Sequence, residues 1–359
     1  PYIHNILLIE KYELRNDFIN SNAPFIQIIP KFHKDPISFR VIISSSNAPL
    51  ETISKRLTTV LRFITNKLNN YTKTIQEYTG INFFWIINNN NKIIEDIKKL
   101  NNKGLMKTIF TYDFTTLYTN ITHEEIKTAM NYVLQLSFHK NDNLKVVCIG
   151  NKCKWTYSKN IHNNNYIYTY DFKTITNMIN DLISNSFFMA GQLIYKQQIG
   201  LPMGTSCSPF LANLVLFYYE YKFLKENLRI NRYICKKLFY TYRYIDDITV
   251  INDGGFFDKI YNKIYPKNLE LKKINTTNKK EANVLDLNIT INTFNRATIR
   301  LYDKRENFPF LINNFPNPIS NISLNMCYQV VLNELQRLKR INTHYNDLNL
   351  DIKINYLIY

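Results

Sequence analysis

Two adjacent carboxylates are the feature of this sequence with the clearest chemical potential. Asp246 and Asp247 stand between two runs rich in β-branched and aromatic residues, 238–245 and 248–251. Such flanks predict a β-hairpin with the acidic pair at its tip. Neighbouring carboxylates repel each other, so the pair is costly unless solvent or a cation compensates. A plain polar turn would explain an isolated pair, but the Tyr- and Arg-rich strand before it favours a site.

A third carboxylate, Asp113, lies near the end of another predicted strand. The segment 108–114 is β-branched and aromatic, which is typical of a strand. It is followed by Thr122-His-Glu-Glu125, a capping-box pattern that predicts a helix starting just after Thr122. Loops that connect a strand to a helix often carry ligand-binding residues. Asp113 is therefore a further candidate for a functional site.

Glycine is scarce, so its clustering is informative. The chain has 8 glycines, where average usage would give about 25. Three of them gather in one region, namely Gly191, Gly200 and Gly204. Ser208 followed by Pro209 predicts an N-cap and a first helical residue, with the helix continuing through Tyr219. Glycines before a helix allow a flat group to approach the backbone, although a capped core helix explains most of the pattern.

The charge balance indicates a polyanionic partner. The 359 residues carry 45 Lys and Arg against 28 Asp and Glu, a formal net charge of +17. Neutralising phosphates releases their counterions, which favours nucleic acid as the partner. Aromatic residues make up 14% of the chain and offer stacking surfaces. No apolar run approaches the ~18 residues of a membrane span, so we expect no membrane contact.

The five cysteines predict no disulfide framework, because their number is odd. Cys148 and Cys153, with His162 nearby, are one ligand short of a local zinc site. A reducing, intracellular location is the simpler interpretation. The chain begins Pro1-Tyr2 without a visible secretory signal, so we expect it to be a fragment.

Two further segments have distinct composition. Residues 142–170 are polar and rich in Tyr and Asn, which indicates an exposed insertion of short strands. The last 55 residues are basic, with apolar residues at near-helical spacing: Leu332, Leu335, Leu338 and Ile341. An amphipathic core helix with a solvated basic face and a nucleic-acid contact both remain open there.

Taken together and in this order, these segments resemble the catalytic domain of reverse transcriptases. The resemblance is greatest to Penelope-like retroelements, a group related to telomerase reverse transcriptase. Five segments carry it: the fingers motifs at 30–34 and 39–44, the first catalytic motif at 113–121, the template and nucleotide motif at 200–216, and the acidic hairpin at 244–247. The period-two run 284–291 is similar to the strand that closes the palm. One departure is Arg40-Val41-Ile42, where the family has Arg-Pro-Ile.

The resemblance implies an α+β fold in the form of a right-hand polymerase, with fingers, palm and thumb. Its antiparallel palm sheet would be backed by helices. We expect an N-terminal segment and fingers at 1–105, a palm at 106–304 with the insertion near 142–170, and the start of a truncated helical thumb at 305–359.

The resemblance also implies a metal centre. Nucleotidyl transfer uses two divalent cations, roughly 3.5–4 Å apart, and hard cations prefer carboxylate oxygens. Asp113 and Asp246 would bridge two Mg²⁺ ions, with Asp247 close by and Phe114 lending its backbone carbonyl. Mn²⁺ could replace Mg²⁺.

Further residues would bind the nucleotide. Arg40, with Lys31 and Lys34, would hold the triphosphate, since a guanidinium offers a bidentate fork. A solvated basic loop explains the two lysines nearly as well.

Tyr118 occupies the position of the family's steric gate against a ribose 2′-hydroxyl, although a core tyrosine is the alternative. Met203 and Gly204 would pack beneath the base pair. Lys272 or Lys273 would protonate the leaving pyrophosphate, and the sequence does not separate these two.

The resemblance thus predicts an RNA-directed DNA polymerase of a retroelement. Its partners would be an RNA template, a DNA primer and dNTPs, and we expect it in the nucleus. The number of subunits is not indicated. Two alternatives stay open: an RNA-dependent RNA polymerase, which the aromatic Tyr118 disfavours, and a catalytically retired RNA-binding scaffold. Such relics usually lose the catalytic aspartates, and Asp113, Asp246 and Asp247 are all present.

Overall fold

The computed structural model describes the greater part of the chain. The described residues are 10–12, 23–32, 36–44, 48, 50–141, 143–157, 167–202, 204–275, 278–310, 312, 316–317 and 319–343. Within them, no helix is long and apolar enough to span a bilayer.

The centre of the molecule is an antiparallel sheet of four strands in the order β11-β3-β10-β9. Its strands are β3 (Ile109–Phe114), β9 (Thr241–Tyr244), β10 (Asp247–Ile251) and β11 (Leu271–Lys273). The predicted strand at 108–114 and the predicted hairpin are both confirmed, although of the acidic pair only Asp246 lies in the turn and Asp247 is the first residue of β10.

Alternation along the strands divides the sheet into two faces. Phe110, Tyr112 and Ile248 point into the main apolar core. Ile109 and Ile251 point the opposite way and join a second core. Asp113 and Asp247 share that second face, farther along the same strands, where both side chains are only half-buried.

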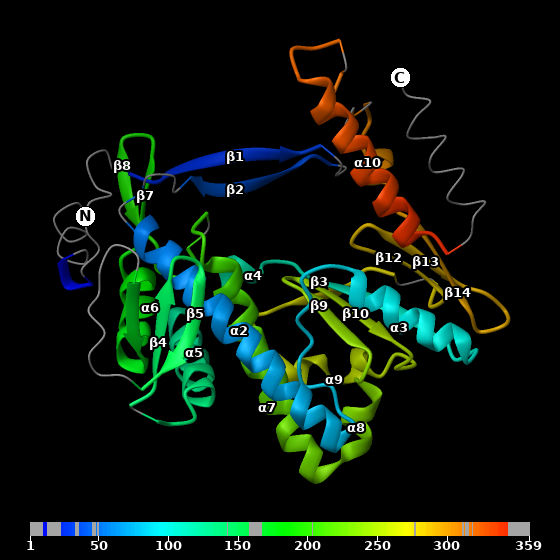
Figure 1. Cartoon of the computed structure of the whole chain (residues 1–359), viewed down its shortest axis with the longest axis horizontal. Coiled ribbons are helices and arrows are strands. Elements are labelled where there is room, and N and C mark those ends of the chain that lie inside the picture. The colour runs from blue at the N-terminus through cyan, green and yellow to red at the C-terminus, as the bar shows by residue number, and fades with distance from the viewer. Residues whose placement is uncertain are drawn as a thin grey trace.

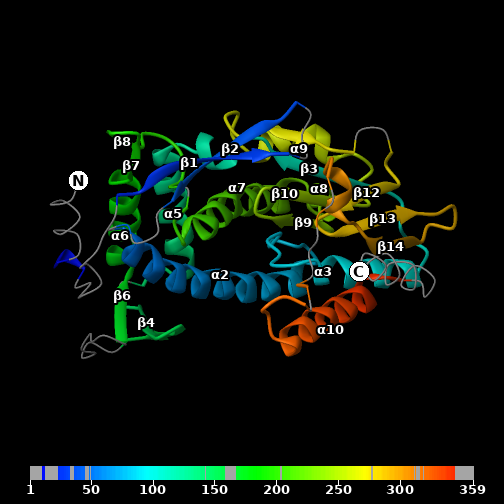
Figure 2. The same cartoon turned by 90° about the horizontal axis from the view of Figure 1, so that it is seen from above.

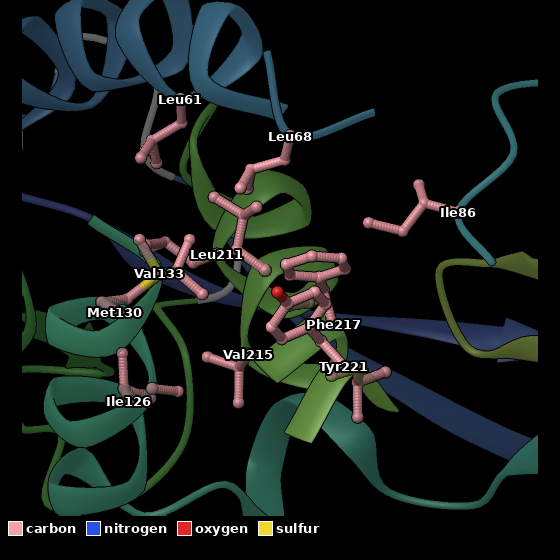
Figure 3. Close-up of a cluster of buried hydrophobic side chains, with 14 of the residues drawn as sticks. Leu61, Leu68, Ile86, Ile126, Met130, Val133, Leu211, Val215, Phe217 and Tyr221 are labelled. Carbon is pink, nitrogen blue, oxygen red and sulfur yellow. The ribbon is translucent and has the colours of Figure 1, made fainter. Parts of the chain in front are cut away.

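Three long helices form the main core with the sheet: α2 (Glu51–Thr79), α5 (His123–Ser137) and α7 (Ser208–Ile230). Figure 3 shows side chains such as Leu61, Met130 and Leu211 meeting between them. The shorter helices are α4 (Leu117–Asn120), α6 (Phe172–Ser184), α8 (Arg232–Lys237) and α9 (Phe257–Ile264). This core supports the sheet from one side.

Two predicted helix starts can be compared with the structure. Thr122 accepts from the backbone N of Glu125, and the Glu125 carboxylate accepts from the backbone N of Thr122, which confirms the capping box. The second start is off by one residue. Cys207 is the N-cap of α7, Ser208 is its first residue, and the helix continues past Tyr219 to Ile230.

The second core lies between a separate three-stranded sheet and two helices. The sheet has the order β12-β13-β14 and consists of β12 (Glu281–Val284), β13 (Leu287–Ile291) and β14 (Ala297–Leu301). The helices are α3 (Asn91–Asn102) and α10 (Leu324–Ile341), and both contact β14. They lie at the same end of the molecule as this sheet (Figure 2). A short 3-10 helix, η1 (Lys304–Asn307), follows β14.

This sheet corrects one expectation. The run 284–291 is not a single strand of the central sheet, because the chain turns at Leu285 and Asp286. Val284 ends β12, and Leu287–Ile291 form β13, which pairs back onto β12. Leu285 adopts a positive φ of 58° at that turn. The helix α10 confirms the predicted helical spacing near the C-terminus, with Leu338 and Ile341 buried.

A third sheet extends away from the core. Its order is β2-β1-β7-β8, with β1 (Phe25–Lys31), β2 (Ser38–Ser44), β7 (Phe187–Ala190) and β8 (Leu193–Lys196). In Figure 1 the blue β1–β2 hairpin reaches outward from β7 and β8. The Phe32 ring near its tip lies 5.8 Å from the Phe310 ring, centroid to centroid.

The fourth sheet is the predicted insertion. It has the order β5-β4-β6, with β4 (Lys145–Ile149), β5 (Lys152–Thr156) and β6 (Ile167–Asp171). The expectation of an exposed insertion is wrong for β4, because Val146 and Val147 are buried.

The expectation about the cysteines is also corrected. Cys148 and Cys153 face each other across the β4–β5 ladder and form a disulfide. Their sulfurs are therefore not zinc ligands in this structure, and His162 lies outside the described residues. The other three cysteines, Cys207, Cys235 and Cys327, are free and buried.

Candidate active site

Three carboxylates converge at one end of the central sheet. Asp113 on β3 and Asp247 on β10 are paired directly across the ladder, so their side chains leave the sheet on the same face. Asp246 precedes Asp247 in the β9–β10 turn. One oxygen from each of the three carboxylates lies within 4.8 Å of the other two. The strand register, together with the tight turn, creates this cluster.

The turn that carries Asp246 has an unusual backbone. Tyr244 pairs with Asp247, so Ile245 and Asp246 alone connect the two strands. Ile245 has a φ of 55°, a conformation that a β-branched residue rarely adopts and that costs on the order of 1–3 kcal/mol. The carbonyl of Asp246 accepts from the backbone N of Phe114 at 3.2 Å, which fixes the turn to the end of β3.

The carboxylates are electrostatically unfavourable as an isolated group. The pKa of Asp247 is raised to about 6, first by burial and then by the negative charges of Asp246 and Asp113. Lys304, on η1, opposes the shift. A divalent cation would remove the repulsion and use the same oxygens as ligands. Three carboxylates within reach of one another are a donor set that suits Mg²⁺ or Mn²⁺, so the residues present fit the expected ions.

The register of β11 shows which of the two lysines faces the carboxylates, a question that the sequence left open. Lys272 is paired with Asp113 in the ladder, so its exposed side chain leaves the sheet on the face of the carboxylates. Lys273 points to the opposite face. Its Nζ lies 2.6 Å from Asp258 Oδ2 and 4.0 Å from the centre of the Phe110 ring. Of the two, Lys272 is the lysine on the carboxylate face.

Tyr118 lies on α4, beside the carboxylates. Its pKa is raised to about 12 by burial and by the negative charge of Asp246. The carbonyl of Tyr118 accepts from the backbone N of Leu201 at 2.7 Å. Gly200 has a φ of +91°, and a Cβ at that position would stand 2.5 Å from the same carbonyl oxygen. The glycine is needed because the two backbones touch.

The other residues predicted to bind the nucleotide do not all lie on the central sheet. Lys31 and Arg40 lie on the β1–β2 hairpin, in a different sheet from the carboxylates. Gly204 is described, with a positive φ of 84° just before α7. Lys34 and Met203 lie outside the described residues.

Sequence reasoning missed three residues around this site: Lys304, Arg243 and Glu220. Lys304 is the cation that acts on Asp247. Arg243 and Glu220 form a fully buried ion pair behind the β9–β10 hairpin, with Nε 2.6 Å from Oε1. One signal was available, because an arginine inside an otherwise aromatic and β-branched strand requires a partner when it is buried. Its partner on α7 is distant in sequence and gave no local sign.

No family model matches the chain, and no curated protein matches it either. Among solved structures, it is similar to telomerase from Candida albicans in complex with a TWJ fragment of telomeric RNA. The TM-score is 0.58 at 15% identity, over 93% of this chain and 53% of that one.

Two telomerase structures from Candida tropicalis are similar as well. The apo form gives a TM-score of 0.55 at 14% identity, over 95% of this chain and 57% of that one. The complex with a TWJ fragment of telomeric RNA gives 0.54 at 13% identity, over 99% and 56%. The chain thus spans little more than half the length of these telomerases. At such low identity the likeness concerns the fold, and that fold is reverse-transcriptase-like.

Proposed function

We propose that this chain is an RNA-directed DNA polymerase that adds dNTPs to a primer 3′-hydroxyl, and that it derives from a retroelement of the Penelope-like kind. The observation that carries the proposal is the meeting of Asp113, Asp246 and Asp247 on two paired strands. The reverse-transcriptase-like fold and the net charge of +17 support it. A nuclear location stays a prediction.

The three carboxylates would hold two Mg²⁺ ions, with the Phe114 carbonyl as a further ligand. When bound, the ions lower the pKa of the attacking hydroxyl and neutralise charge on the leaving group. In this proposal the fold is a right-hand polymerase: the central sheet is the palm, the β1–β2 hairpin belongs to the fingers, and α10 begins the thumb.

In the proposed reaction, the primer 3′-oxygen forms a bond to the α-phosphorus of the dNTP, and the bond to pyrophosphate breaks. The hydroxyl proton leaves to solvent. Lys272 gives a proton to the departing pyrophosphate, since it is the lysine that shares a face with Asp113. Arg40 and Lys31 bind the triphosphate, and Gly204, with Met203, lies beneath the base pair.

Tyr118 would select the sugar. Its ring is half-buried beside Asp246. The close approach of Gly200 to the Tyr118 carbonyl restricts the backbone of Tyr118. We propose that a ring held in this way excludes a ribose 2′-hydroxyl. This argues for dNTPs and against an RNA-dependent RNA polymerase.

Primer extension tests the proposal. The purified chain should extend a DNA primer on an RNA template with Mg²⁺ or Mn²⁺, should prefer dNTPs to NTPs, and should be inactive in EDTA. Tight binding of the template–primer without any extension would instead identify a retired RNA-binding scaffold. Extension with NTPs alone would identify an RNA polymerase.

A further inference from the structure

The side chain of Arg243 is a buried cation with a hydrogen-bond partner for each of its nitrogens. It is fully buried, and five contacts use its three nitrogens. Nε and Nη2 donate to the two carboxylate oxygens of Glu220, at 2.6 and 3.3 Å. Nη1 and Nη2 donate to the side-chain and backbone oxygens of Asn213, at 2.7 and 3.0 Å.

The fifth contact reaches the acidic turn. Nη1 also donates to the carbonyl of Ile245 at 3.1 Å. Ile245 is the residue with a φ of 55°, and Asp246 follows it directly. Arg243 therefore binds the one carbonyl whose direction depends most on the strained conformation of the turn.

Arg243 acts from behind the sheet. It is paired with Ile248, which points into the main core, whereas Asp247 is paired with Tyr244 on the opposite face. The other two partners of its side chain, Asn213 and Glu220, lie on α7. The guanidinium thus joins the acidic turn to α7, the helix that follows the Gly200–Cys207 loop.

The backbone of Arg243 is fixed as well. Its N donates to Trp85 O at 2.6 Å, and its carbonyl accepts from Ile87 N at 2.9 Å. Glu220 is held by a further partner, because Tyr265 Oη donates to its Oε1 at 2.9 Å. Since both ends of the ion pair are immobilised, Arg243 has a single position from which it contacts the turn.

We propose that Arg243 is a positioning residue that holds Ile245 in its positive-φ conformation and so brings Asp246 and Asp247 to Asp113. A lysine could keep the charge opposite Glu220, but it lacks the planar fork that reaches Glu220, Asn213 and Ile245 together. The inference rests on the proposed function only in that the carboxylates bind divalent cations.

The test measures binding of Mn²⁺ alone to the full chain, by the electron paramagnetic resonance signal of the free ion. Arg243→Lys should raise the half-saturating Mn²⁺ concentration at least fivefold in protein that still melts cooperatively. Tyr265→Phe is the matched control. It removes a bond to Glu220 within the same buried network but leaves the turn untouched, so Mn²⁺ binding should stay within twofold of wild type.

A third variant separates positioning from general damage. Glycine adopts a positive φ without strain, so Ile245→Gly should restore Mn²⁺ binding when added to Arg243→Lys. Wild-type binding in Arg243→Lys, an equal loss in Tyr265→Phe, or no rescue by Ile245→Gly would each overturn the proposal. If Arg243→Lys does not melt cooperatively, the double variant Arg243→Met, Glu220→Gln takes its place in the same comparison, because it removes the contact to Ile245 without leaving one buried charge unpaired.

The experiments distinguish a failure of the role proposed for Arg243 from a failure of the proposed polymerase function. A wild-type chain that binds Mn²⁺ and responds to these variants but extends no primer would refute the polymerase and leave the role of Arg243 intact. A chain that extends primers normally with Arg243→Lys, and binds Mn²⁺ as the wild type does, would refute only the role of Arg243.

Discussion

The central sheet and the β1–β2 hairpin carry the two halves of the predicted site, and they are built in opposite ways. The strands around Asp113 and Asp247 are backed by fully buried side chains such as Ile248. Along the hairpin that carries Lys31 and Arg40, apolar side chains are largely exposed, with Ile28 at 64% and Phe39 at 62%. Residues that must meet within a few ångströms thus lie on a rigid scaffold, and residues proposed to meet a substrate lie on an extended arm.

The largest expected difference between the two regions is in stability. Phe257 is fully buried, with its ring 4.9 Å from that of Tyr112 behind the sheet. Phe257→Ala should lower the free energy of unfolding by about 3–5 kcal/mol, whereas Phe39→Ala should change it by less than about 0.5 kcal/mol. Denaturant unfolding of both variants measures this. Equal losses would show that the hairpin is as firmly packed as the sheet.

The next prediction concerns Tyr118, the residue beside the central sheet that is proposed to discriminate dNTPs from rNTPs. Tyr118→Ala should increase rNTP incorporation relative to dNTP by a large factor, because it removes the ring and keeps the backbone contact with Gly200. Tyr118→Phe should change the ratio little. Steady-state incorporation of both sugars, with a melting curve for each variant, gives the answer. An unchanged ratio in folded Tyr118→Ala would make Tyr118 a core residue only.

The extended arm should affect nucleotide binding rather than the fold. Arg40→Ala should raise the dNTP KM about tenfold, as expected for loss of a hydrogen bond to a charged group, while the melting temperature and kcat stay close to wild type. Arg296, exposed at the β13–β14 turn, gives the matched control Arg296→Ala. A KM that is equal in the two variants would remove Arg40 from the nucleotide site.

The smallest effect concerns proton binding at Asp247. Its pKa is raised in the folded state, to about 6 from an ordinary value of 3.8, so the folded protein binds more protons than the unfolded chain between these values. Without divalent ions, this group therefore lowers stability as pH rises from about 4 to about 6. Asp247→Asn should stabilise the metal-free protein at pH 7.5 more than at pH 4.5, which melting curves in EDTA will show. A difference of the opposite sign would contradict the assignment.

Sequence patterns predicted the local features well. The strand before Asp113, the acidic hairpin and the capping box at Thr122 all depend on neighbouring residues, and all three are confirmed. The disulfide was missed because odd cysteine counts say nothing of which strands pair. The run 284–291 was misjudged because its alternating pattern continues through a turn at Leu285.

The sequence could not predict contacts that depend on the pairing and packing of elements far apart in the chain. Lys272 and Lys273 are equivalent in sequence, and only pairing with β3 puts Lys272 on the face of Asp113. The partners Arg243 and Glu220 are 23 positions apart, on a strand and a helix. Neither relation has a local signature, because each depends on how separate elements pack.

In the proposed function, three carboxylates on the paired strands form one metal-dependent centre. The most direct measurement is primer extension by Asp246→Asn beside Asp258→Asn, with template–primer affinity determined for both. Each variant removes one negative charge, but Asp258 binds Lys273 on the opposite face of the sheet. We expect no extension by Asp246→Asn and near wild-type extension by Asp258→Asn, with similar affinities. Extension by Asp246→Asn at the wild-type rate would contradict the account.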